Sequence, residues 1–172
     1  MSTTLSLAAL LTFGALSLSF YNSQSGPKQQ AAPKFTELSR DDVAGLDKQR
    51  ALVAAAAKQR YGVSGLTRTK ADLPVLQRLI DDHAFTKTQT YELQSLGVAL
   101  GDVMASELPM RWMIVTDEFG TDRTLRYKDT TIQVGALTMI SKRIERDEKV
   151  NVSRLLEITR EQLPRFEKEL TK

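Results

Sequence analysis

A long uncharged segment at the N-terminus divides this chain into two parts. No side chain carries a charge before Lys28, and the stretch from Leu5 to Tyr21 is almost entirely apolar and small residues. Seventeen helical residues would extend about 25 Å, the short limit for crossing a bilayer. We therefore expect residues 1–21 to act as a signal peptide or an N-terminal membrane anchor and to stay outside the folded core.

The residues around this segment leave two topologies open. Small residues near Ser17 and Ser25 fit the preference of signal peptidase, although a basic stretch ahead of the apolar run is missing. The cations Lys28, Lys34 and Arg40 follow the run, and this bias favours a retained anchor with a cytoplasmic domain. We expect a cell-envelope protein and favour an exported, periplasmic domain, because the run is only marginally apolar; an inner-membrane anchor with a cytoplasmic domain is the alternative.

The residues after the apolar run predict a linker and then one domain. Residues 22–34 contain three glutamines, two serines, one glycine and two prolines, a composition that buries too little apolar surface to order itself. Residues 35–172 are long enough to bury about two thirds of their unfolded surface without a disulfide or a metal. We expect a flexible linker at 22–34 and a single domain at 35–172.

Hydrophobic periodicity predicts the elements of this domain. Helices are expected at 39–61, 73–84, 89–108, 137–147 and from 152 almost to 172, and strands at 111–117, 124–127 and 130–134. The residues predicted to be buried are Leu96, Leu100, Trp112, Ile114 and Ile140. This order predicts an α+β fold in which N-terminal helices and a long C-terminal helix pack on a small three-stranded antiparallel sheet.

Composition excludes several kinds of chemistry. Cysteine is absent, so the chain has no thiolate nucleophile, disulfide or CxxC redox pair. The single histidine, His83, leaves little room for a zinc site or a Ser-His-Asp relay. We expect no cofactor and no metal. Nucleic-acid binding is not expected either, because 24 basic side chains face 21 acidic ones and no aromatic and basic platform is seen.

Two sets of charged residues are candidates for ligand or partner contacts. Asp117 and Glu118 end a predicted strand, where adjacent side chains point to opposite faces, so turn formation is the favoured interpretation. Arg126, Lys142 and Arg143 could converge on an anion such as a lipid head group. Alternatively, they could pair with the two carboxylates inside the domain, which is favoured because arginine matches carboxylates well.

The middle third of the chain contains a series of short motifs: Leu96-Gly97, Leu100-Gly101-Asp102, Trp112, Asp117-Glu118, Gly120, Leu125-Arg126-Tyr127 and Thr138-Met139-Ile140-Ser141-Lys142-Arg143. Together these motifs resemble a bacterial α+β domain family of unknown function. The resemblance implies an α+β domain in a bacterial protein. It implies no reaction, since a shared fold does not fix an activity.

These observations favour a non-catalytic interaction module over an enzyme. It would reach the membrane through its N-terminal segment and bind a protein partner through the basic first helix, the last helix kinked by Pro164, or both. The alternative is a binder of a small anionic ligand or lipid head group. A carboxylate-dependent hydrolase around Asp117 and Glu118 is the least favoured function.

Overall fold

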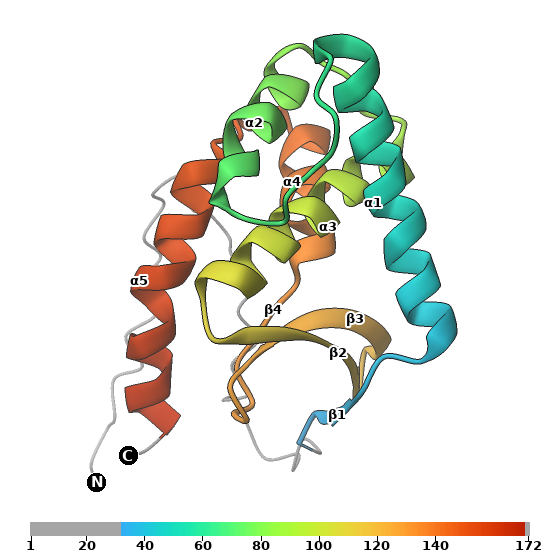
Figure 1. The fold of residues 1–172 in the computed structure, drawn as a ribbon. Coiled ribbons are helices and arrows are strands. Elements are labelled where there is room, and N and C mark those ends of the chain that lie inside the picture. Colours follow the sequence, from blue (N-terminus) through green and yellow to red (C-terminus); the bar gives the residue numbers. More distant parts are fainter. Residues whose placement is uncertain (1–31, 171–172) are drawn as a thin grey trace, which may run out of the picture.

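Helices stack on one side of a small antiparallel sheet in this protein (Figure 1). The structure is a computed structural model and describes residues 32–170. The expectations for residues 1–21, and for the linker up to residue 31, concern residues outside this range. Within residues 32–170, no helix is both long and apolar enough to cross a membrane. The α+β class is confirmed.

The sheet has four strands, so the expected three-stranded sheet is wrong by one strand. Its order is β1 (Lys34–Thr36), β2 (Met110–Asp117), β3 (Gly120–Tyr127) and β4 (Gln133–Val134), with every neighbouring pair antiparallel. The added strand is β1, where Phe35 pairs with Val115 on β2. Three residues are too few to show an alternating pattern, so only the tertiary pairing reveals this edge strand.

The strand β3 is longer than its sequence predicts. The ladder between β2 and β3 continues to the pair Asp117 and Gly120, so only Glu118 and Phe119 form the turn. Aspartates and a glycine at 117–123 favoured a longer loop, but continuous cross-strand pairing extends the strand through them. β4 contains only two residues and leads directly into the next helix.

The helices agree with the predicted ones to within a few residues. They are α1 (Arg40–Tyr61), a short 3-10 helix η1 (Lys70–Asp72), α2 (Leu73–Asp81), α3 (Thr90–Glu107), α4 (Ala136–Glu145) and α5 (Val152–Leu170). Ser39 and Asp42 form the capping box that starts α1, and Gly62 ends this helix in the left-handed region with φ 70°. Asn151 starts α5 by accepting the N–H of Arg154 at 2.9 Å.

The core forms around α3, as the sequence predicts. Leu96, Leu100 and Ile140 are at most 1% exposed, as predicted. Trp112 and Ile114 are only half-buried, so the prediction that they are buried is wrong. A Cβ on Gly97 would lie 2.4 Å from the carbonyl oxygen of Leu137. Glycine at this position therefore lets α4 approach the backbone of α3.

The last helix, α5, carries apolar and small residues spaced by three and four positions, and most of them pack inside the domain. Val152, Leu156, Thr159 and Leu163 are buried in the core, and only Leu170 at the end of the helix is exposed. The last helix therefore offers no continuous apolar strip to a partner.

Candidate functional site

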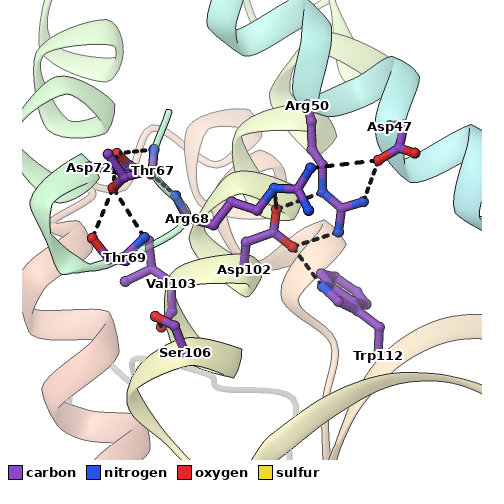
Figure 2. A network of polar contacts seen from close by, with 10 residues as sticks. All are labelled: Asp47, Arg50, Thr67, Arg68, Thr69, Asp72, Asp102, Val103, Ser106 and Trp112. Carbon is purple, nitrogen blue, oxygen red and sulfur yellow. Dashed lines mark hydrogen bonds and ion pairs between the residues drawn. The ribbon is translucent and has the colours of Figure 1, made fainter. Parts of the chain in front are cut away.

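A buried ion pair joins α1, α3 and β2 (Figure 2). Asp102 on α3 is 7% exposed, and its two carboxylate oxygens accept hydrogen bonds from Nε and Nη2 of Arg50, both at 2.7 Å. The indole N–H of Trp112 donates to the same carboxylate at 2.9 Å. The Asp102 side chain thus connects α3 to α1 and to β2. Its hydrogen bond with Arg50 raises the pKa of the arginine.

Neighbouring side chains complete this Asp102 cluster, which we define as Asp47, Arg50, Arg68, Asp102 and Trp112. Asp47 accepts Nη1 of Arg50 at 2.8 Å, and the Arg68 guanidinium lies 3.8 Å from Asp47 and 4.0 Å from Asp102. The cluster therefore contains two cations and two anions. Three guanidinium nitrogens of Arg50 donate hydrogen bonds to Asp102 and Asp47. The cluster lines a hollow of about 450 Å³, but its charges are neutralised internally, so we assign it to the stability of the fold.

The predicted carboxylates lie at the hairpin between β2 and β3. Asp117 accepts the backbone N–H of Phe119 at 2.9 Å, which is the turn-forming role expected for an aspartate before a glycine. Glu118 is an exposed residue of the turn itself. The two side chains do not line a common hollow.

Arg126 lies at the opposite end of the hairpin. Its cross-strand partner is Arg111, six positions before Asp117 on β2, a separation of about 20 Å along the strand. Arg126 donates to the carbonyl oxygens of Thr130 and Asp129 at 2.8 and 2.7 Å and stacks on the ring of Phe35 at 4.5 Å. Arg126 was expected beside a carboxylate, with Asp117, Glu118 and Asp122 as candidates. It does have an acidic neighbour, but this is Asp129 at 3.9 Å, so the three candidate partners were wrong.

Lys142 and Arg143 are adjacent on α4 but occupy different surroundings. Lys142 is exposed, whereas Arg143 is 4% exposed. Nη1 of Arg143 donates to the carbonyl oxygen of Met139 at 2.6 Å, and its Nε and Nη2 have no partner among residues 32–170. Burial lowers the pKa of Arg143. Arg126, Lys142 and Arg143 do not meet at any hollow identified in this part of the chain.

A small polar hollow forms where β4 leaves the sheet and α4 begins. Its volume is about 320 Å³, and we call it the α4 hollow. It is lined by Val115, Asp117, Phe119, Gly120, Thr121, Asp122, Arg123, Thr124, Gln133, Gly135, Thr138 and Lys142. Of the five predicted contact residues, Asp117 and Lys142 are brought together here.

A larger groove of about 750 Å³ lies on a different part of the domain, and we call it the α2–α4 groove. Its apolar floor is made by Leu79, Ile80, Phe85, Leu93, Leu96, Ile144 and Val150, and its polar rim by Asp81, His83, Thr86, Lys87, Asp147, Glu148 and Lys149. Lys87 and Asp147 form an ion pair between the two loops that border it. His83 and Asp147 both have positive φ values, 47° and 61°, a conformation uncommon for residues other than glycine.

The groups that metal or relay chemistry would need are not gathered within residues 32–170. No group of three His, Asp or Glu residues there could hold a metal ion. His83 is an exposed residue of the groove rim.

Sequence reasoning missed three residues that matter for these sites. Arg50 and Asp47 lie on a helix noted only for its basic charge, and their partner Asp102 is 52 residues from Arg50 in the chain. Gln133 is 8% exposed and lines the α4 hollow, but a single glutamine in a short strand gives no sequence signal. Asp102 was noted only as part of the family-like motif, which gave no sign of its partners.

Comparison with known proteins supports the same class of domain. Residues 72–155 match the family described as Domain of unknown function (DUF3806), and this range includes all the residues that carry the resemblance. A crystal structure of a protein from Bacteroides thetaiotaomicron VPI-5482 superposes with a TM-score of 0.66 at 13% identity, covering 77% of this chain and 49% of that one. The chain thus spans about half the length of that protein, and the likeness shows the fold alone. No match is found among curated proteins. The resemblance to a bacterial domain family of unknown function is confirmed.

Proposed function

We propose that this protein is a non-catalytic interaction module of the cell envelope, and that a segment of a partner protein docks in the α2–α4 groove. The observation that carries the proposal is the apolar floor of this groove. Large side chains from α2, α3 and α4 line a hollow of about 750 Å³, which is within the range of ligand and peptide sites. Such a floor gains free energy when a partner's apolar side chains displace water.

The charges at the rim favour a protein segment as the occupant. Lys149 lines the same opening as Asp81 and Glu148, so the rim carries both signs. An anionic membrane surface would be attracted by an excess of cations, which this rim lacks. A polypeptide can match both signs while it buries an apolar side chain below them.

Other surfaces offer less to a partner. Most of the apolar residues of α5 are buried within the domain, and the arginines of the Asp102 cluster are paired with its aspartates. Of the cations considered for an anion site, Arg126 is held by its own loop and Arg143 is buried. A hydrolase would need a facing pair of carboxylates, and Asp117 and Glu118 lack that arrangement.

The envelope location rests on the N-terminal segment of the sequence. Residues 5–21 are apolar or small and uncharged, and we favour export over a retained anchor. Fractionation with intact-mass measurement tests this part. A shortened chain in the periplasm supports export, full-length chain in membranes supports an anchor, and full-length chain in the cytosol contradicts both.

Truncation of the groove floor tests the docking site. Full-length protein is used to capture partners from membranes, and the partner identified by mass is purified and titrated against each variant. Phe85→Ala should weaken binding by about tenfold or more, as expected for an aromatic anchor. Tyr91→Ala is the matched control, because Tyr91 is 49% exposed and lies outside the groove lining; its affinity should stay within about twofold of wild type.

Three results would contradict this docking site. The first is equal binding by the Phe85→Ala and wild-type proteins. The second is a dimer of this chain that Phe85→Ala dissociates, which would make a second copy the occupant. The third is binding to anionic lipid vesicles that the same substitution abolishes.

A further inference from the structure

The first turn of α4 opens towards the α4 hollow without a side-chain cap. Its N-cap residue is Gly135, and because glycine has no side chain, no side chain caps this end of the helix. The first N–H groups of a helix have no acceptor inside it and carry a partial positive charge. Both Gly135 and Thr138, in this first turn, line the hollow. This end of the hollow therefore presents hydrogen-bond donors to an anion.

A mostly buried glutamine provides an independent sign of a ligand. Gln133 is 8% exposed and lines the same hollow. Within residues 32–170 its side-chain amide makes no hydrogen bond, and it is not among the residues with further interactions. Its amide atoms are not among the fully buried polar atoms that lack a partner, so they open onto the hollow. The amide of Gln133 is thus placed to bind a group inside the hollow.

Lys142 adds a full positive charge at the helix side of the hollow. It follows Thr138 by four residues, so the two side chains lie on the same face of α4. Lys142 is exposed and forms no ion pair with residues 32–170. Arg123, the other cation of the lining, donates instead to Gln49 on α1 at 3.4 Å. Lys142 is therefore the cation available to a ligand.

The sheet side of the hollow carries the opposite charge. Asp117 is opposite Gly120, and Asp122 is opposite Val115, so the two carboxylates are diagonal neighbours on one face of the sheet. Each accepts one backbone N–H, from Phe119 and Arg123, and neither forms an ion pair within the described part of the chain. Phe119, 75% exposed, stands at the rim.

We infer that the α4 hollow binds a small zwitterion, a free α-amino acid or a short peptide with an apolar side chain. Its carboxylate binds the first turn of α4, Gln133 and Lys142, and its ammonium group lies between Asp117 and Asp122. Its side chain contacts the ring of Phe119. A hollow of about 320 Å³ has room for a ligand of this size. The site is separate from the α2–α4 groove and does not rest on the function proposed for that groove.

A titration with whole and partial ligands tests this inference. The full-length chain is titrated by ligand-detected NMR with L-phenylalanine, glycyl-L-phenylalanine, 3-phenylpropionate, 2-phenylethylamine and inorganic phosphate. L-phenylalanine or the dipeptide should bind saturably, and whichever binds more tightly identifies the source of the zwitterion. The three probes with one kind of charge should bind at least about tenfold more weakly, because each leaves one end of the hollow unpaired.

Matched variants locate the binding. Lys142→Met and Asp117→Asn should each weaken the better zwitterion by about tenfold, whereas Lys58→Met, an exposed lysine on α1 outside the hollow, should leave its affinity unchanged. Lys142 is exposed, and an asparagine at position 117 keeps a side-chain oxygen that can accept the N–H of Phe119, so both variants retain the fold.

The inference is overturned by any of four results. Phosphate or 3-phenylpropionate binding as tightly as the zwitterions would mean a simple anion site. 2-Phenylethylamine binding as tightly would mean a simple cation site. The absence of saturable binding to the wild-type protein with any probe, or wild-type affinity in Lys142→Met, would also overturn it.

Discussion

Replacement of Asp102 by alanine should remove a large part of the stability of this domain. The carboxylate is 7% exposed and accepts three hydrogen bonds, two from Arg50 and one from Trp112. Its loss leaves an arginine with a side chain 16% exposed without its main partner. Breaking one partner of a buried ion pair costs about 3–5 kcal/mol. Because Arg50 keeps Asp47, we expect the lower end, about 3 kcal/mol.

Urea unfolding gives the measurement. Trp112 is the single tryptophan of the chain and touches the substituted side chain, so its fluorescence reports on this region, and far-UV circular dichroism checks the same transition. Asp47→Ala is the matched control: it removes a carboxylate from the same arginine, but that carboxylate is 56% exposed. Its cost should be below about 1 kcal/mol.

The size of the difference decides whether the Asp102 cluster holds the fold together. A loss for Asp102→Ala below about 1 kcal/mol, equal to that for Asp47→Ala, would refute the argument from burial. A double-mutant cycle with Arg50→Met separates the pairwise coupling from the packing of each side chain.

Two further predictions concern Gly97 on α3 and Asp42 on α1. Gly97→Ala should destabilise the domain by about 1–3 kcal/mol, because the new Cβ would meet the carbonyl oxygen of Leu137 at 2.4 Å. Gly65→Ala has nothing within 4 Å and is the control; equal unfolding midpoints for the two variants would contradict the close approach. Hydrogen bonds from the Ser39 side chain and backbone lower the pKa of Asp42 from 3.8, so its contribution to stability is present above this pH and is lost as the pH falls through the folded pKa. Asp42→Asn should therefore have a lower free energy of unfolding than wild type at neutral pH, and this free energy should fall less than that of wild type below about pH 4. A fall as steep as that of the wild-type protein would contradict this role of Asp42.

The sequence predicted the features that depend on neighbouring residues. The predicted helix ends near residues 39, 61 and 152 agree with the structure because the capping box at Ser39, the left-handed Gly62 and the cap at Asn151 each form within four or five residues of the helix end. Leu96 and Leu100 were found from the helical period for the same reason.

Features that depend on distant pairing could not be predicted. Arg126 and Asp117 are near in sequence, but the antiparallel register carries them to opposite ends of the hairpin. β1 becomes a strand only because β2 pairs with it. Arg50 and Asp102 meet because α1 crosses α3, and Gln133 becomes buried where β4 turns into α4. Each contact joins segments whose separation the sequence alone does not define.

Site-specific photo-crosslinking in living cells tests the groove as a docking site most directly. A photoreactive amino acid replaces Lys149 at the groove rim in one strain and Lys58 on α1 in another; both lysines are exposed, and Lys58 lies outside the groove. The account predicts that the probe at position 149 forms a discrete adduct with one partner protein and that the probe at position 58 does not. Phe85→Ala should abolish that adduct. The same adduct from both positions, or an adduct that persists in the Phe85→Ala protein, would contradict docking in the α2–α4 groove.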